Sequence, residues 1–258
     1  MTRSLEAKKL LFIAGAHKSG TSIFHRCIRD HPEISGFEGT GVPEDEGQLL
    51  QTVFPAAKKF GGMGRFGFNP DAEFLEDHPL VSPANAETLI EQWSPHWDLS
   101  RSVLVEKSPP TIIRARFFQA LFPEQSHFVL LMRHPVSVSN STGRWTEQPL
   151  EELIEHWLVL HERFEERQRA GLRRLMVVRY EDFCRDAQSV IEKVWSFVGL
   201  DPVPLQREVR QGIDDKYFRR WNRMGWTPWG RKRRNQIISR LETRLEDLDY
   251  GYSLLKAP

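Results

Sequence analysis

Short runs of consecutive apolar residues alternate along the chain with longer segments of helical character. The apolar runs lie at 9–15, 102–105, 127–132 and 175–178. Continuous apolar runs of this length are typical of strands in a parallel sheet that is covered on both faces. The helical segments lie at 20–30, 84–97, 111–122, 136–144, 150–169, 187–198 and 235–248. The alternation predicts an α/β fold in which right-handed crossovers place helices on both faces of a central parallel sheet.

The first apolar run continues into the segment AGAHKSGTS at 14–22, which predicts a tight loop and the start of a helix. Gly15 and Gly20 allow the backbone to turn sharply and to approach a ligand closely. The unpaired N–H groups at a helix start attract anions, and the helix dipole adds to this effect. Together with the ammonium of Lys18 and the hydroxyls of Thr21 and Ser22, they predict a phosphate pocket. An ordinary strand-to-helix turn with a surface lysine is the alternative.

A second predicted anion site follows the apolar run at 127–132. Arg133 comes directly after this run, and Ser141 lies about two helical turns further along. Arginine is suited to bidentate binding of phosphate. Ligands of parallel sheets bind beyond the carboxyl ends of the strands, where four cations are expected: Lys18, Lys107, Arg133 and Arg179. Two anion sites at one sheet edge indicate a nucleotide that carries phosphates at both ends.

Four carboxylates stand in the glycine-rich segment 33–47, close in sequence to the predicted phosphate loop. Apart from Glu33 at its start, they are Glu38, Glu44, Asp45 and Glu46. Negative charge beside a phosphate is unfavourable unless one of the carboxylates takes part in the chemistry. A solvated acidic loop is the alternative for most of the four. The segment is therefore where we expect a general base.

Composition and charge narrow the choice of protein class. The 258 residues are 40% hydrophobic and carry a net charge of +1, so no overall field recruits nucleic acid. The only two cysteines, Cys27 and Cys184, are expected to be buried thiols. The apolar run at 10–14 is too short for a signal peptide or a membrane span. We therefore expect one domain over residues 1–258, in the cytoplasm, with no membrane span and no nucleic-acid partner.

Two further segments fall outside the alternation of strands and helices. Residues 48–83 are irregular and rich in Gly and Phe, and a loop this long predicts a lid or an acceptor-binding element. Residues 216–234 are basic, with interleaved Tyr217, Trp221, Trp226 and Trp229. Three roles are open for this basic segment: it closes over a bound ligand, it binds an anionic acceptor, or it forms a solvated surface. The aromatic residues favour a role that faces a ligand.

The two anion motifs together resemble those of the sulfotransferases that use 3′-phosphoadenosine 5′-phosphosulfate (PAPS). The segment 17–22 is similar to the loop that binds the 5′-phosphosulfate in that family, and Arg133-His134-Pro135 with Ser141 is similar to its 3′-phosphate motif. The turn at 106–109 and the segment 180–182 are similar to the branch that contains carbohydrate and tyrosyl-protein sulfotransferases. The resemblance covers residues 10–200 and implies the P-loop-like sulfotransferase fold.

The resemblance assigns roles to the residues that match the family's motifs. Lys18 would bind the oxygen that bridges phosphate and sulfuryl group, and Arg133 with Ser141 would bind the 3′-phosphate. No metal is expected, because the transferred SO₃ carries less charge than a phosphoryl group and needs only positioning and a few cations. The nucleotide-binding residues implied in this way are His17, Lys18, Ser19, Gly20, Thr21, Ser22, Arg133, Ser141 and Tyr180.

The resemblance also implies a general base. In related glycan sulfotransferases the base is a Glu that follows the loop lysine at a matching distance and precedes x-Gln. Glu46-Gly47-Gln48 matches this pattern, so Glu46 would take the proton from the acceptor hydroxyl. The other candidates are Glu44, Glu38, His17 and His134.

The sequence thus predicts an enzyme of EC 2.8.2 type that moves a sulfuryl group from PAPS to a hydroxyl and releases 3′,5′-bisphosphoadenosine (PAP). Lys107 is expected near the sulfuryl group or the acceptor, with a surface cation as the alternative. A P-loop-like kinase of small metabolites and a non-catalytic nucleotide-binding protein are the rival functions. The kinase is disfavoured because Lys18 precedes Gly20 instead of following it directly. No motif identifies the acceptor, which is a glycan, a tyrosine, a lipid or a small natural product.

Overall fold

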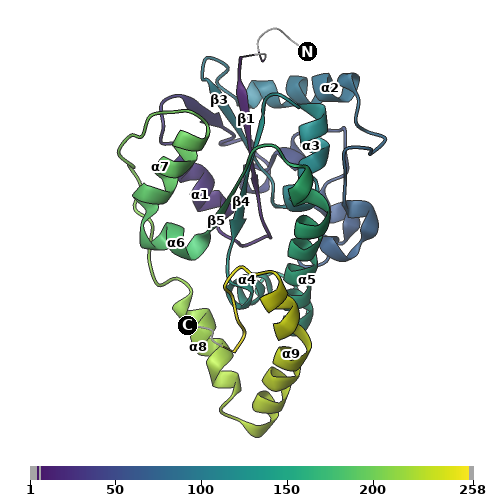
Figure 1. Cartoon of the computed structure of the whole chain (residues 1–258), viewed down its shortest axis with the longest axis vertical. Helices are drawn as coiled ribbons and strands as arrows, with labels where there is room; N and C mark the ends of the chain where they lie inside the picture. Colours follow the sequence, from purple (N-terminus) through teal and green to yellow (C-terminus); the bar gives the residue numbers. More distant parts are fainter. Residues whose placement is uncertain (1–4, 6, 256–258) are drawn as a thin grey trace.

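Five parallel strands form the centre of the molecule (Figure 1). The computed structural model describes Leu5 and residues 7–255. The strands are β1 (Lys9–Ala14), β2 (Ile34–Gly36), β3 (Val103–Lys107), β4 (Ser126–Met132) and β5 (Leu175–Arg179), and their order is β2-β3-β1-β4-β5. All four expected strands are confirmed. The short strand β2 was not expected, because it lies inside the segment that the glycines and carboxylates marked as a loop.

Helices cover both faces of the sheet, which confirms the expected fold class. The helices on one face are α1 (Thr21–Ile28) and α7 (Ala187–Phe197), and those on the other are α2 (Pro83–Trp93), α3 (Ala115–Leu121) and α5 (Leu150–Arg163). Side chains of β1 alternate between the two cores. Leu11 and Ile13 pack with α1 and α7, whereas Leu10 and Phe12 pack with α2 and α3. Both faces of β1 are therefore buried, which explains why its hydrophobic run is unbroken.

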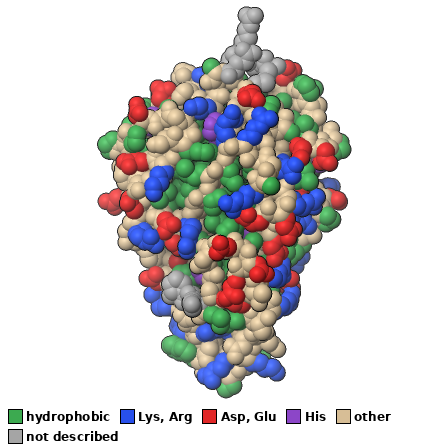
Figure 2. All heavy atoms as spheres, in the orientation of Figure 1, with side chains coloured by type: hydrophobic (Ala, Val, Ile, Leu, Met, Phe, Trp, Pro, Cys, Tyr) green, Lys and Arg blue, Asp and Glu red, His purple; other side chains and the backbone are tan. Residues whose placement is uncertain are grey.

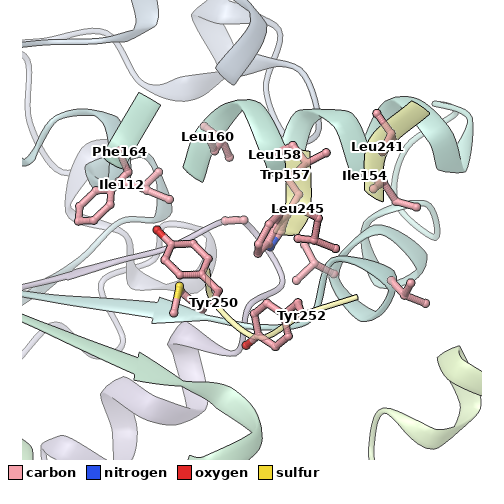
Figure 3. Close-up of a cluster of buried hydrophobic side chains, with 14 of the residues drawn as sticks. Ile112, Ile154, Trp157, Leu158, Leu160, Phe164, Leu241, Leu245, Tyr250 and Tyr252 are labelled. Atoms are coloured by element: carbon pink, nitrogen blue, oxygen red, sulfur yellow. The ribbon is translucent and has the colours of Figure 1, made fainter. Parts of the chain in front are cut away.

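The remaining helices lie at the carboxyl end of the sheet. They are α4 (Pro135–Thr142), α6 (Tyr180–Arg185), α8 (Asp215–Met224) and α9 (Pro228–Asp247). In Figure 1, α8 and α9 form a hairpin that makes the narrow end of the molecule. Figure 3 shows how α9 is anchored: Leu241 and Leu245 lie with Trp157 and Leu158 of α5 in one buried cluster. Tyr250 and Tyr252 of the segment after α9 complete this cluster.

Three expected helices have different bounds in the structure. The expected helix at 235–248 begins earlier, at Pro228, because Thr227 caps it by accepting a hydrogen bond from the Gly230 N–H. The expected helix at 150–169 ends at Arg163 and continues as a π-helical turn over Phe164–Gln168. The expected helix at 111–122 is split into a 3₁₀ turn, Pro109–Ile113, and α3. The helix α8 was not predicted, because charged residues outnumber the apolar residues in its sequence.

The long irregular segment at 48–83 is packed along its length. It contains the short 3₁₀ turns Ala57–Phe60, Phe66–Phe68 and Pro70–Ala72. Arg114 reaches into it from the start of α3 and donates hydrogen bonds to the carbonyls of Ala72 (3.0 Å) and Pro55 (3.1 Å). Burial lowers the pKa of Arg114 to about 9. The buried guanidinium therefore ties together backbone that has no helix or strand of its own.

A buried carboxyl group at the end of β3 supports the neighbouring loop. Glu106 is almost inaccessible, and its side chain accepts hydrogen bonds from the Ser108 hydroxyl and the Gly47 N–H. A Cβ at Gly47 would lie 2.6 Å from a Glu106 carboxyl oxygen, so only glycine allows this approach. Burial raises the pKa of Glu106 from 4.5 to about 7, although Ser108 and Lys107 act in the opposite direction. The protonated form is therefore favoured in the folded protein.

The raised pKa of Glu106 predicts a pH-dependent loss of stability. The folded chain holds this proton up to about pH 7 and the unfolded chain releases it near pH 4.5, so stability falls as pH rises through that window. We expect Glu106→Gln to remove this loss. Relative to wild type, the variant should gain up to about 3 kcal/mol of unfolding free energy between pH 5 and pH 8.

Urea denaturation at both pH values checks this expectation. Glu124→Gln, which changes an exposed carboxylate, serves as the control and should follow wild type at both pH values. A Glu106→Gln variant that runs parallel to wild type across the window would show that the carboxyl is not held protonated.

Candidate active site

The pairing of β1 with β4 brings the two predicted anion sites together. Ala14 pairs with Leu130, so the residues that follow the two strands, Lys18 and Arg133, leave the sheet side by side. The Arg133 guanidinium donates a hydrogen bond to the Lys18 carbonyl at 2.8 Å. Both side chains line one hollow of about 280 Å³. Its lining is His17, Lys18, Gly20, Thr21, Ser22, Ile23, Arg26, Glu44, Glu46, Met63, Pro109, Arg133 and Ser141.

The loop between β1 and α1 is held in an unusual backbone conformation. Lys18 has φ +68°, in the left-handed region that side chains other than glycine rarely adopt. Gly20 has φ +94°, and a Cβ there would lie 2.3 Å from the ring of Tyr180. Strained residues of this kind persist where the surrounding structure holds them, as at ligand-binding loops. The contact from Tyr180 and the hydrogen bond from Arg133 supply that support here.

The Lys18 ammonium projects from this loop toward an exposed aromatic ring. Its Nζ lies 4.6 Å from the ring centre of Trp145, in the connection between α4 and α5. Trp145 is 69% exposed, so it covers the ammonium from the solvent side without being part of the core.

A buried ion pair faces the loop from β3. Lys107 is 1% exposed, and its Nζ lies 3.7 Å from a Glu46 carboxyl oxygen. The same ammonium donates a 2.6 Å hydrogen bond to the Glu44 carbonyl. The alternative that Lys107 is a surface cation is therefore wrong. Lys107 lies behind the lining of the hollow, where it fixes the backbone and a carboxylate of the acidic loop.

The environments of Glu44 and Glu46 separate their pKa values. Glu44 accepts a 2.7 Å hydrogen bond from the Ser22 hydroxyl, and this bond, with help from Lys107 and Lys18, lowers the pKa of Glu44. Burial raises the pKa of Glu46, and Lys107 offsets only part of this effect. Two carboxylates whose pKa values are moved apart suit different tasks, and the one with the raised pKa is the better proton acceptor.

Gln48 fixes the orientation of Glu46. Its side-chain amide donates a 2.5 Å hydrogen bond to the Glu46 carboxylate, and its amide oxygen accepts one from the Ala57 N–H at 2.8 Å. The Gln48 backbone N–H donates to the Ser108 hydroxyl at 3.0 Å. The amide therefore links the carboxylate to the irregular segment 48–83. This geometry gives a physical reason for a glutamine two positions after the glutamate.

The Arg133 side chain is held by Asp214, by the ring of Tyr180 and by the Lys18 carbonyl described above. Asp214, just before α8, accepts hydrogen bonds from its guanidinium, one of them at 3.2 Å, and the guanidinium carbon lies 4.3 Å from the ring centre of Tyr180. Burial opposes the charged form of Arg133, but Asp214 outweighs it, so the pKa of the arginine is raised. Asp214 could not be predicted as a partner of Arg133, because the two residues are 81 positions apart in the chain.

Ser141, the other residue of the second predicted anion site, is also contacted by a side chain of α8. Ser141 lines the hollow, and the Tyr217 hydroxyl forms hydrogen bonds with Ser141 and Arg144. Burial acts against ionisation of this phenol, but the two hydrogen bonds prevail and lower the pKa of Tyr217. Thus a carboxylate lies on one, and a phenol hydroxyl on the other, of the two residues predicted to bind a phosphate.

The histidines at the site are neutral. Burial, with the Lys18 and Lys107 ammonium groups, lowers the pKa of His17 to about 3. Burial lowers the pKa of His134 to about 4. Both ring nitrogens of His134 are engaged, since Nδ1 accepts from the Val136 N–H and Nε2 lies 3.2 Å from the Ser253 carbonyl. His134 therefore caps α4, whereas Nδ1 of His17 is buried without a partner among the described residues.

Most of the predicted site residues meet at the hollow. Lys107, Ser19 and Tyr180 lie behind its lining, and the Ser19 hydroxyl is buried without a partner in the described part of the chain. Sequence analysis did not identify Met63, Arg26 or Trp145. Met63 is informative because it brings the segment 48–83 to the hollow. Within residues 5 and 7–255, no group of His, Cys, Asp and Glu side chains is arranged to hold a metal ion.

Two further observations concern the cysteines and the helices. Cys27 and Cys184 are free thiols, the first buried and the second half-buried. Of the helices that the structure describes, none combines the length and the apolar character needed to cross a bilayer.

Known structures share this architecture. A sulfotransferase from Alicyclobacillus acidocaldarius is 18% identical, covers 93% of this chain and 96% of its own, and has a TM-score of 0.50. The sulfotransferase domain from the curacin biosynthetic pathway is also 18% identical, covers 80% of each chain, and has a TM-score of 0.50. At this level of identity the likeness concerns the fold.

A comparison at the level of sequence families adds to the structural likeness. A model described as "Sulfotransferase family" matches residues 11–204, which include the loop after β1, the acidic segment, Lys107, Arg133 and Ser141. The match extends over most of the chain and contains every strand except the first two residues of β1. The chain belongs to the sulfotransferase family.

Proposed function

We propose that the protein transfers a sulfuryl group from PAPS to a hydroxyl acceptor. The observation that carries the proposal is the single hollow lined by both Lys18 and Arg133, with a direct hydrogen bond between the arginine and the lysine carbonyl. One nucleotide can therefore reach the loop after β1 with its 5′ end and Arg133 with its 3′-phosphate. Membership of the sulfotransferase family gives independent support.

The residues of the loop suit the 5′ end of such a nucleotide. The N–H groups at the start of α1 lack partners within the helix, and no acidic residue stands in its first turn. The unpartnered Ser19 hydroxyl and His17 Nδ1 are buried here and have capacity for a ligand. Lys18 would donate to the oxygen that leaves with the phosphate, so that the charge developing there is stabilised.

Glu46 has the properties of the general base. It lines the hollow, its pKa is raised by burial, and Gln48 and Lys107 hold its carboxylate in place. As the acceptor oxygen forms its bond to sulfur, Glu46 would take the hydroxyl proton. The bond from sulfur to the phosphate oxygen breaks, and Lys18 would neutralise the oxygen that is released. Glu44 is the less suitable base because its pKa is lowered.

The acceptor would approach from the side of Met63 and Trp145. Met63 comes from the segment 48–83, which is the segment expected to bind the acceptor, and Trp145 is an exposed ring beside the Lys18 ammonium. Aromatic faces are suited to stacking against rings and sugars. These contacts support an acceptor with an apolar or ring-shaped face next to its hydroxyl.

The 3′ end of the proposed nucleotide competes with groups of the protein itself. A 3′-phosphate on Arg133 and Ser141 would replace Asp214 and Tyr217. The hollow of about 280 Å³ lies just below the range of about 300–1,000 Å³ typical of pockets for drug-sized ligands. Movement of the start of α8 away from Arg133 would both free the cation and enlarge the pocket.

The proposed 3′-phosphate site predicts selectivity among nucleotides. PAP should raise the thermal unfolding midpoint far more than 5′-AMP does, because only PAP has a phosphate for Arg133. Differential scanning fluorimetry with both nucleotides measures the effect. In Arg133→Ala the advantage of PAP should vanish, while Arg29→Ala, which alters an arginine paired with Glu38, should keep it. Equal shifts for PAP and 5′-AMP in the wild type would contradict the proposal.

The assignment of the base predicts different outcomes for two neighbouring glutamates. Glu46→Gln should lower kcat by about 10²–10⁴-fold, as is usual when a general base is removed, and should retain PAP binding. Glu44→Gln should keep at least a tenth of the activity. Transfer of a labelled sulfuryl group from PAPS to a panel of hydroxyl acceptors measures turnover, and fluorimetry measures PAP binding. Turnover retained in Glu46→Gln would move the base to Glu38, Glu44 or His17.

The competition at Arg133 predicts a variant with tighter nucleotide binding. Asp214→Asn removes the carboxylate that pairs with the guanidinium, and loss of one charge-assisted hydrogen bond changes affinity by about tenfold or more. We therefore expect PAP to bind about tenfold more tightly and 5′-AMP to bind as before. Titration calorimetry gives both constants. Weaker PAP binding in the variant would mean that Asp214 orients Arg133 for the ligand.

A further inference from the structure

Positive charge is concentrated in one short segment of the chain. Residues 216–234 contain eight Lys and Arg and no Asp or Glu. The remaining residues hold 28 of the 36 Lys and Arg and all 35 Asp and Glu, so their net charge is −7. The small overall charge of +1 therefore hides a strong separation of charge.

The structure places this segment at one end of the molecule. It forms α8, the start of α9 and the turn between them, which we call the hairpin tip (residues 216–234). Figure 1 shows the hairpin as the narrow end of the molecule, with the turn between α8 and α9 farthest from the sheet. In Figure 2 the side chains at this end are blue and green. The tip therefore projects as a surface of cationic and apolar groups, and on the side of α4 and α5 it borders a hollow of about 370 Å³.

Two tryptophans of the hairpin tip are exposed without a role in packing. Trp226 is 75% exposed and Trp229 is 73% exposed. Trp221 in the same segment shows the contrast, because it is fully buried and its indole N–H donates to the Leu254 carbonyl at 3.1 Å. Trp226 lies in the turn and Trp229 in the first turn of α9, so both residues are at the turn end of the hairpin.

The cations around these tryptophans have no carboxylate partners among the described residues. Further along α9, Arg240 pairs with Glu151 and Glu155, and Arg244 pairs with Glu162. In the hairpin tip the exposed cations form no ion pair with a described carboxylate. They are Lys216, Arg219, Arg220, Arg223, Arg231 and Lys232. Their charge is thus available to an anionic partner outside the chain.

We propose that the hairpin tip docks on an anionic membrane surface. Tryptophan favours the interface between lipid headgroups and acyl chains, and nearby Lys and Arg each gain about 1 kcal/mol from anionic lipid. A projecting end with two exposed tryptophans suits contact with a planar bilayer surface. The negative remainder of the chain lies away from the tip and would face water. This peripheral docking involves no membrane-spanning segment.

The geometry also favours a bilayer over a nucleic acid. A long polyanion would extend past the tip onto the body of the molecule, where the net charge is −7. A bilayer contacts only the end of the hairpin, so the repulsion is limited to groups farther from the surface and is screened beyond about 8–10 Å at physiological salt. The charge and the shape of the hairpin tip therefore both favour a bilayer as its partner.

The test is binding of the full chain to vesicles. We expect it to sediment with vesicles of phosphatidylcholine and phosphatidylglycerol in a 1:1 ratio, and not with phosphatidylcholine alone. Raising the salt to about 0.5 M should release most of it, because screening weakens the attraction. Brominated lipid in the anionic vesicles should quench part of the tryptophan fluorescence. Binding that is equal for neutral and anionic vesicles would overturn the proposal.

Variants separate the contributions of charge and aromatic rings. Arg231→Glu with Lys232→Glu should weaken vesicle binding by at least about thirtyfold, whereas the matched control Lys58→Glu with Lys59→Glu, an adjacent exposed pair elsewhere, should bind like wild type. Trp226→Ala with Trp229→Ala should reduce both binding and quenching. All of these positions are exposed, so thermal unfolding of the variants should match wild type.

A gel-shift assay with single-stranded and duplex RNA and DNA identifies the rival occupant. Failure to bind anionic vesicles, combined with nucleic-acid binding that Arg231→Glu with Lys232→Glu abolishes, would overturn the proposal. Vesicle binding that survives both the charge and the tryptophan variants would overturn it too. None of these readouts depends on sulfuryl transfer, so the result is independent of the function proposed above.

Discussion

The close approach of β1 and β4 is the constraint on which the site depends. A Cβ at Gly15 would lie 2.6 Å from the Leu131 carbonyl oxygen, so a side chain there would force the two strands apart. With glycine, the strands stay paired to their ends, and the loop that carries Lys18 begins beside Arg133. A parallel sheet gathers the carboxyl ends of its strands at one edge, and here that edge collects cations from β1, β3 and β4.

Cations gathered in this way need partners when they are buried, because an isolated charge is costly in the interior. Lys107 is matched by Glu46 and by the Glu44 carbonyl, and Arg133 is matched by Asp214. The two ion pairs have different consequences for the site. The pair at Lys107 lies behind the hollow and fixes a carboxylate that faces into it. The pair at Arg133 occupies the position where an anionic ligand is expected.

Much of the architecture follows from local sequence. Four strands were predictable because their apolar runs are continuous, and the loop after β1 was predictable because glycines, a lysine and hydroxyls follow such a run. The short strand β2 could not be predicted, since Ile34–Gly36 lies among turn residues and gains its pairing from β3. The helix α8 was missed because its buried residues, Tyr217, Phe218 and Trp221, are outnumbered by charges that the hairpin exposes.

The site was predictable only where one segment carried several of its features. Lys18, Arg133 and Glu46 stand in recognisable local patterns, and the structure brings all three to one hollow. Asp214 and Tyr217 reach Arg133 and Ser141 from a distant helix, and Trp145 approaches Lys18 across a turn. Contacts of this kind depend on how the elements pack, and no spacing in the sequence reports them.

The pairing of Asp214 with Arg133 has a consequence for the end of a reaction cycle. A bisphosphorylated product held by several cations leaves slowly unless something takes its place. Under the function proposed above, Asp214 would return with the start of α8 and re-form its pair with the guanidinium as the 3′-phosphate of the nucleotide loosens. Such an internal counter-ion would speed the departure of spent nucleotide and return the enzyme to a state ready for the next donor.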